Sequence, residues 1–126
     1  MRDDLETWQK VNLTAFVVSG LGSEHPGLIG EPYVDGSGRV ELAKFGLPVL
    51  VYAGDSAGVT RAFHRAVGRD LSVSVYTDEL FSTGNDVDNR AAVAAVATEE
   101  LSVAGFAVAG ERKQVDKVFD KLKFHP

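Results

Sequence analysis

The strand and helix pattern from Pro48 to Gly68 constrains the fold of this chain more than any other feature. Its first part, Pro48 to Ala53, is almost entirely apolar, which is typical of an interior parallel strand covered by helices on both faces. A helix follows, with Asp55 or Ser56 as its cap. One face of that helix is apolar at helical spacing, formed by Val59, Ala62, Phe63, Ala66 and Val67.

The rest of the chain repeats this alternation of strands and helices. Residues Leu71–Tyr76 alternate apolar and polar side chains, which predicts a strand. Thr7 can cap a first helix that runs to about Ser19, before Gly20, and that places Trp8 in the core. Further predicted elements are a hairpin of residues 31–34 and 39–42, a helix over 87–97 capped by Asp86, a strand over 102–108 and a helix over 112–122. The pattern predicts a three-layer α/β/α fold with a mixed, mostly parallel sheet.

The length and composition limit the class of protein. A chain of 126 residues is expected to form a single domain with one core, spanning residues 1–126. The absence of cysteine excludes disulfides, thiolate nucleophiles and cysteine-ligated metal sites. No run of roughly 18 apolar residues and no secretory signal occurs, so we expect a cytoplasmic protein without a membrane partner. The net charge of −5 disfavours tRNA as a partner.

Motifs for metals and cofactors are not found in the sequence. His25, His64 and His125 lack the mutual spacing of metal ligands, so we predict no metal site. No phosphate-binding loop and no dinucleotide fingerprint is present, and no cofactor is predicted.

Several blocks of residues, in the same order along the chain, resemble the domain-of-unknown-function family two thousand (DUF2000). They cover essentially the whole chain. The blocks are residues 3–16, 28–33, 46–53, 75–81 and 89–93, together with 115–118 and the ending at 122–123.

This resemblance implies the fold of type II peptidyl-tRNA hydrolases, enzymes that cleave the ester between a peptide and tRNA. Asp78 matches the acidic residue that follows the third strand in those enzymes, and Ser82 and Thr83 match the hydroxyl residues after it. Lys10 lies beside, and not on, the lysine positions of the hydrolases. The resemblance therefore implies Asp78 and Lys10 as catalytic candidates, and a homodimer.

The start of the chain departs from the family, which usually opens with an apolar strand before the Arg-Asp-Asp-Leu stretch. Here Met1-Arg2 stands directly before that stretch, so the first strand is expected to be missing. Such a gap would leave backbone groups of neighbouring strands unpaired. Either the start codon was assigned too late, or another segment fills the gap. The candidates to fill this gap are the hairpin that contains Tyr33 and Val40 and a strand exchanged between subunits.

Three functions from different classes remain open. The preferred hypothesis is a domain that binds a small molecule near the strand ends through Asn12, Asp78, Ser82 and Thr83. In the second, an ester hydrolase, Asp78 orients water and Lys10 holds phosphate. The third is an interaction module with an exposed edge or apolar patch. Asp78 is equally suited to capping a helix, and Asn12 to tying down a loop by a hydrogen bond.

Overall fold

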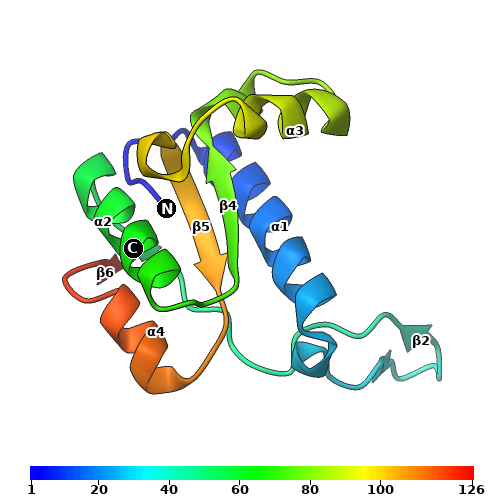
Figure 1. The fold of residues 1–126 in the computed structure, drawn as a ribbon. Helices are drawn as coiled ribbons and strands as arrows, with labels where there is room; N and C mark the ends of the chain where they lie inside the picture. Colours follow the sequence, from blue (N-terminus) through cyan, green and yellow to red (C-terminus); the bar gives the residue numbers. More distant parts are fainter.

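In the computed structural model, which describes residues 1–126, two antiparallel strands form the centre of the molecule. These are β4 (Val73–Thr77) and β5 (Val103–Val108), paired from Val73 with Val108 to Thr77 with Val103. Helix α1 (Thr7–Glu24) covers one face of this pair, and α2 (Ser56–Gly68) with α4 (Arg112–Val118) covers the other (Figure 1). Helices and strands are thus mixed, as the alternating pattern predicts.

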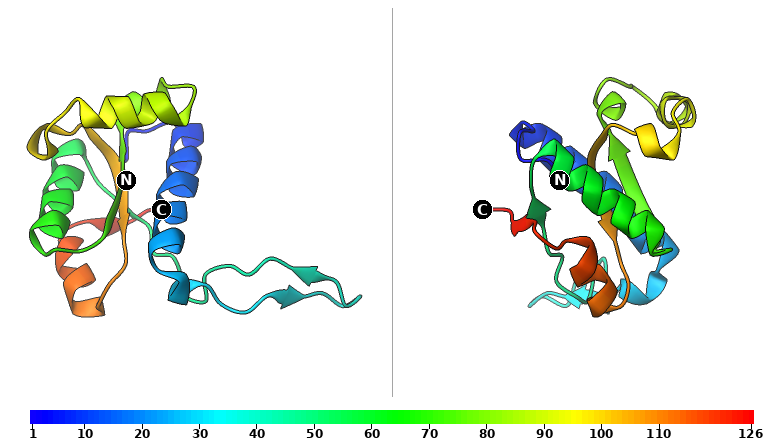
Figure 2. Two further views of the ribbon diagram at one scale, coloured as in Figure 1. Left: turned by 45° about the vertical axis from the view of Figure 1, so that its right-hand side comes forward. Right: turned by 60° about the vertical axis from the view of Figure 1, so that its left-hand side comes forward.

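The direction of β5 differs from the mostly parallel sheet expected from the sequence. The connection from β4 consists of the short helix η2 (Asp78–Phe81), α3 (Asp86–Ala94) and the short helix η3 (Thr98–Glu100). Helix α3 lies across the end of the two strands and does not return along a face of the sheet (Figures 1 and 2). The chain therefore re-enters at the end where it left, and β5 runs antiparallel to β4.

The interior strand predicted at Pro48–Ala53 is reduced to its last two residues. Strand β3 (Tyr52–Ala53) pairs antiparallel with β6 (Lys123–Phe124), while Val49 and Leu50 are exposed. Between β3 and β5 lies only the segment Met1–Asp3. The Arg2 amide donates to the Ala104 carbonyl oxygen, and the Asp3 amide to that of Gly54, each at 2.9 Å. The bridge of Arg2 with Gly54 is the one parallel pairing in the structure.

The predicted hairpin is confirmed, but it lies outside the central layers. Strands β1 (Tyr33–Val34) and β2 (Val40–Glu41) pair only with each other. They form part of a long extension, residues 30–50, that projects away from the rest of the molecule and that we call the arm (Figure 2). The hairpin therefore does not fill the place of the missing first strand. No residue of the arm is buried.

Two buried clusters hold the layers together. One lies between α2, β5 and α4, and it includes Val59, Phe63, Phe106 and Val118. The other lies between α1 and the opposite face of the strand pair, and it includes Leu13, Val17 and Tyr76. The apolar stripe predicted for α2 is buried except for Val67 at its end. Amphipathic spacing therefore identified the buried face of α2 correctly.

Helix α1 is longer than predicted, and its apolar faces are assigned differently. The N-cap is Glu6, whose amide donates to the Gln9 side chain at 2.9 Å, and not Thr7. The helix continues through Gly20, where an added Cβ would lie 2.6 Å from Ser74 Oγ. Gly20 thus permits close packing on β4 and does not end the helix. Trp8, predicted in the core, is 59% exposed, because the buried stripe is Leu13, Val17 and Leu21.

None of these helices combines the length and the apolar character that a membrane crossing requires.

Candidate functional site

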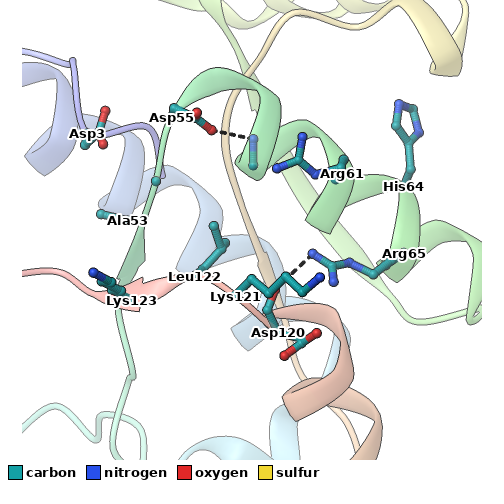
Figure 3. Close-up of a pocket in the computed structure, with 12 residues that line it drawn as sticks. Asp3, Ala53, Asp55, Arg61, His64, Arg65, Asp120, Lys121, Leu122 and Lys123 are labelled. Carbon is teal, nitrogen blue, oxygen red and sulfur yellow. Dashed lines mark hydrogen bonds between the residues drawn. The ribbon is translucent and has the colours of Figure 1, made fainter.

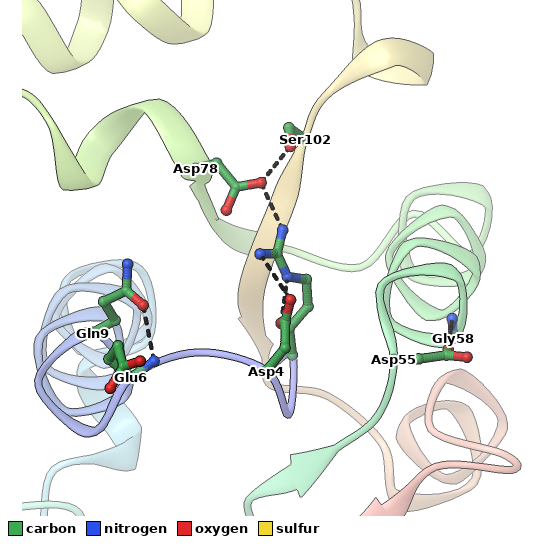
Figure 4. A network of polar contacts seen from close by, with 8 residues as sticks. Asp4, Glu6, Gln9, Asp55, Gly58, Asp78 and Ser102 are labelled. Carbon is green, nitrogen blue, oxygen red and sulfur yellow. Dashed lines mark hydrogen bonds and ion pairs between the residues drawn. The ribbon is translucent and has the colours of Figure 1, made fainter.

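Asp78, the predicted catalytic acid, lies at the carboxyl end of β4 within a network of polar contacts (Figure 4). Its Oδ2 accepts a hydrogen bond from Arg2 Nη1 at 2.6 Å and another from the Ser102 hydroxyl. Arg2 also pairs with Asp4 at 2.9 Å. Burial opposes the charge of Arg2, but the hydrogen bonds to Asp4 and Asp78 outweigh it, so the pKa of Arg2 is raised. The network joins the start of the chain to both central strands.

The hydroxyls of Tyr76 and Thr83 meet at one backbone carbonyl, and Asn12 contacts the first of them. The Tyr76 hydroxyl donates to Asn12 Oδ1 at 2.9 Å and lies 3.3 Å from the carbonyl oxygen of Leu80. The Thr83 hydroxyl donates to the same carbonyl at 3.1 Å and also contacts Asn89. Burial raises the pKa of the Tyr76 hydroxyl. Asn12 therefore links α1 to strand β4 itself, through Tyr76.

Lys10 and Ser82 make no side-chain hydrogen bond in the structure. Lys10 is half-buried on α1, near the amino group of Met1, which donates to the Tyr52 carbonyl oxygen at 2.9 Å. Burial, with a smaller effect of the Lys10 charge, lowers the pKa of that amino group to about 6. Ser82 is exposed. Asn12 and Thr83 are thus linked only through the Tyr76 hydroxyl and the Leu80 carbonyl, and Asp78 lies in a separate network.

A groove that the sequence patterns did not reveal lies between α2 and the turn that leads from α4 to β6 (Figure 3). It has a volume of about 840 Å³, and we call it the α2–β6 groove. Only two of its twelve lining residues, Ala53 and Leu122, are hydrophobic. The basic lining residues are Arg61, Arg65, Lys121 and Lys123, with His64 beside them, and the acidic ones are Asp3, Asp55 and Asp120.

Close packing of glycines forms one wall of this groove. An added Cβ on Gly54 would lie 2.6 Å from Leu122 Cδ2, so a larger residue at the start of α2 would require the Leu122 side chain to move. Asp55 caps α2 by accepting from the Gly58 amide at 2.7 Å. The capping carboxylate is therefore already engaged, and the charge at this wall is partly neutralised by the free amides of the first turn.

Arg65 of α2 reaches across the groove to the β6 turn, where Lys121 lies. Arg65 Nη2 donates to the Asp120 carbonyl oxygen at 3.2 Å, while its Nε is buried without a hydrogen-bond partner. Lys121 adopts a φ of 70°, a left-handed conformation that side chains other than glycine rarely take. Figure 3 shows the Arg65 guanidinium directed toward the Asp120–Lys121 turn. Arg65 is thus held by the Asp120 carbonyl, whereas the side chains of Arg61, Lys121 and Lys123 are exposed and make no hydrogen bond within the chain.

Two separate signals in the sequence correspond to this groove. Arg61, His64 and Arg65 lie on the predicted water-facing side of α2, and Lys121 and Lys123 end the locally basic segment. Nothing in their spacing indicates that the two groups meet, because the contact depends on how β6 returns to β3. No three His, Asp or Glu side chains are clustered as ligands for a metal ion.

These features define a small α/β protein with antiparallel strand pairs and a polar, largely basic groove. The whole chain, residues 1–126, matches the model of the family described as protein of unknown function, DUF2000, and it belongs to that family. It is similar to a solved structure, the protein of unknown function Atu0240 from Agrobacterium tumefaciens strain C58. The two are 38% identical, with a TM-score of 0.96 over 100% of this chain and 93% of that one. No curated protein matches the sequence.

Proposed function

We propose that this protein binds a small anionic ligand, one that carries phosphate or carboxylate groups, in the α2–β6 groove. The observation that carries the proposal is the convergence of Arg61, Arg65, Lys121 and Lys123 on one groove. The chain as a whole has a net charge of −5, so this is a local reversal of its charge. The lining also holds three acidic side chains, but one of them, Asp55, is engaged as the cap of α2, and the four cations outnumber the acids.

The chemistry of the groove favours a hydrophilic ligand. Sites for drug-like molecules are mostly apolar, with a few polar groups, whereas this lining is mainly polar and charged. A volume of about 840 Å³ lies within the range of small-molecule sites. The guanidinium fork of arginine suits carboxylate and phosphate oxygens, and Arg61 is an exposed arginine in the lining.

Calorimetric titration tests this function, with inorganic pyrophosphate and citrate as probes and ionic strength held constant with chloride. We expect saturable binding of at least one probe by the wild-type protein. Arg61→Gln should raise the dissociation constant about tenfold, because a charged contact of about 1.4 kcal/mol is lost. Arg112→Gln is the matched control, since Arg112 lies on α4 outside the groove and is 93% exposed. The absence of saturable binding, or equal effects of both variants, would overturn the proposal.

A second candidate function is hydrolysis of peptidyl-tRNA or a related ester, with the hydrolase-like fold that the family resemblance implies. Its support is the position of Asp78, whose carboxylate is fixed by Arg2 and Ser102 while its side chain stays about one-third exposed (34%). In this proposal Asp78 orients water, Lys10 holds a phosphate, and Asn12, Ser82 and Thr83 contact the substrate.

Incubation of peptidyl-tRNA with the purified protein separates the two candidates. If Asp78 is catalytic, the Asp78→Ala variant should lose activity by a factor of at least about 100, while circular dichroism shows that it is folded. If the folded wild-type protein does not cleave the substrate, this second function is wrong for peptidyl-tRNA, and the anion-binding proposal is unaffected.

A further inference from the structure

The arm and the outer face of α1 are two apolar surfaces that nothing within the chain covers. The residues from Glu31 to Val40 are all exposed, and those from Gly46 to Leu50 are exposed as well. A two-stranded hairpin is marginally stable by itself in water. The arm nevertheless projects from the rest of the molecule, with contacts only at its base (Figure 2).

The two faces of the arm hairpin differ in chemistry. One face is polar, and on it Tyr33 pairs with Glu41. The Lys44 ammonium lies 4.2 Å from the centre of the Tyr33 ring, and Arg39 forms an ion pair with Glu41 at 2.8 Å. Val34 pairs with Val40 on the other side, where the alternation of strand residues also places Leu42. That second face is apolar, and Leu42 is 87% exposed.

Helix α1 carries apolar residues on both of its sides. Its inner face is buried against the strand pair, while Trp8, Val11 and Phe16 are exposed large hydrophobic residues of the outer face. Trp8 lies edge-on to Phe81 and Phe16 edge-on to Tyr76, with 5.7 Å and 5.9 Å between ring centres. A helix that is apolar on all sides is normally covered on all sides. The outer face of α1 therefore lacks a partner within the chain.

The total exposed surface is large enough for a stable interface. The chain exposes 8247 Å², whereas a compact monomer of 13.5 kDa is expected to expose about 6,500 Å². Two copies that hid the excess of about 1,700 Å² each would bury about 3,400 Å², which lies within the range of obligate homodimers.

We propose that the partner of both surfaces is a second copy of this chain, in a two-fold dimer. This inference goes beyond the proposed ligand-binding function. In this dimer the apolar face of each arm, formed by Val34, Val40 and Leu42, packs on the outer face of α1 of the other copy. Two-fold symmetry makes the exchange reciprocal, so both surfaces are covered in both copies.

The base of the arm fixes its direction for such an exchange. The Gly30 amide donates to the Lys44 carbonyl oxygen at 2.8 Å, and the Gly46 amide to that of Leu28 at 2.9 Å. An added Cβ on Gly30 would lie 3.2 Å from Gly46 Cα, so the two strands of the base pass too closely for a larger residue to fit without a shift. The arm thus leaves the molecule along a defined path.

Sedimentation equilibrium and the emission of Trp8, the only tryptophan, test the dimer. The wild-type protein should sediment at twice 13.5 kDa, and Trp8 emission should shift to longer wavelength as dilution separates the copies. Leu42→Asp and Val11→Asp should each raise the dimer dissociation constant at least 100-fold and remove the concentration dependence of the emission. Val87→Asp, at an exposed position on α3, is the matched control and should change neither.

Leu42 has no packing partner within the chain, so circular dichroism of Leu42→Asp should match the wild type. A wild-type protein that stays monomeric at all concentrations would overturn the proposal. A dimer that resists both substitutions, or that weakens only with Leu42→Asp, would also overturn it, since the arm would then dock elsewhere than on α1.

Discussion

The cluster between α2, β5 and α4 and the arm at residues 30–50 use similar apolar residues, but these have opposite environments. Val59, Phe63 and Val118 are buried in the cluster, whereas Val34, Val40 and Leu42 are exposed in the arm. The difference does not lie in hydrophobicity. Helix α2 meets two other elements along its apolar stripe, while the hairpin meets no third element within the chain.

This comparison shows that burial depends on topology as much as on residue type. An amphipathic helix needs a single neighbouring surface, and β5 supplies it because the chain returns across the face of α2. A hairpin needs a sheet or another surface beside it, and the chain brings none to the arm. The core therefore holds the fold together within one copy, and the arm is the part that we propose contacts a second copy.

The largest expected effect sharpens this contrast through a pair of truncations. Phe63 is buried and lies edge-on to Phe106, with 5.8 Å between ring centres. Phe63→Ala should lower the free energy of unfolding by about 3–5 kcal/mol, because it leaves a cavity. Leu47→Ala, at an exposed arm position, should change it by less than about 0.5 kcal/mol. Urea unfolding of both variants measures the two values. Similar losses would show that the arm is as tightly packed as the core.

An intermediate effect is expected where the start of the chain joins the body. Asp78→Asn removes the charge that Arg2 and Ser102 contact, and we expect a loss of about 1–2 kcal/mol in the free energy of unfolding. The control is Asp86→Asn, whose exposed ion pair with Arg90 should contribute about 0.5 kcal/mol or less. If the two variants lose equal stability in urea unfolding, the network around Asp78 does not anchor the segment Met1–Asp3.

The elements that could be predicted from the sequence are those with a strong local signal. Helix α2 begins after its predicted cap, Asp55, and ends at Gly68, because capping and amphipathic spacing agree there. The hairpin around residues 35–38 is also local, since the Asp35 carboxylate and Gly38 in a left-handed conformation shape the turn. Family membership, too, was predicted correctly from short ordered blocks of residues.

The features that could not be predicted depend on contacts between distant segments. The apolar run at Pro48–Ala53 looks like an interior strand, but only its end is flanked, by β6 and by Met1–Asp3, and Val49 and Leu50 remain exposed. The direction of β5 relative to β4 depends on where α3 lies. The spacing of apolar residues along the sequence does not indicate that position. Of the candidate sites, Asp78 was found by its position after a strand, whereas its partner Arg2 is 76 residues away in sequence. The α2–β6 groove was not predicted either, because the residues of α2 and of the β6 turn that line it are also far apart in the sequence.

The smallest expected effect concerns the tip of the arm and tests whether arm and core unfold independently. Asp35 Oδ1 accepts from the Ser37 amide at 2.8 Å and from the Arg39 amide at 3.0 Å. Asp35→Ala should leave the free energy of unfolding unchanged within about 0.5 kcal/mol, because the turn contacts nothing in the core. Hydrogen exchange of the Ser37 and Arg39 amides should nevertheless accelerate, while that of the β5 amides stays constant. Faster exchange in β5 would mean that the arm and the core open together, and the comparison between them would then fail.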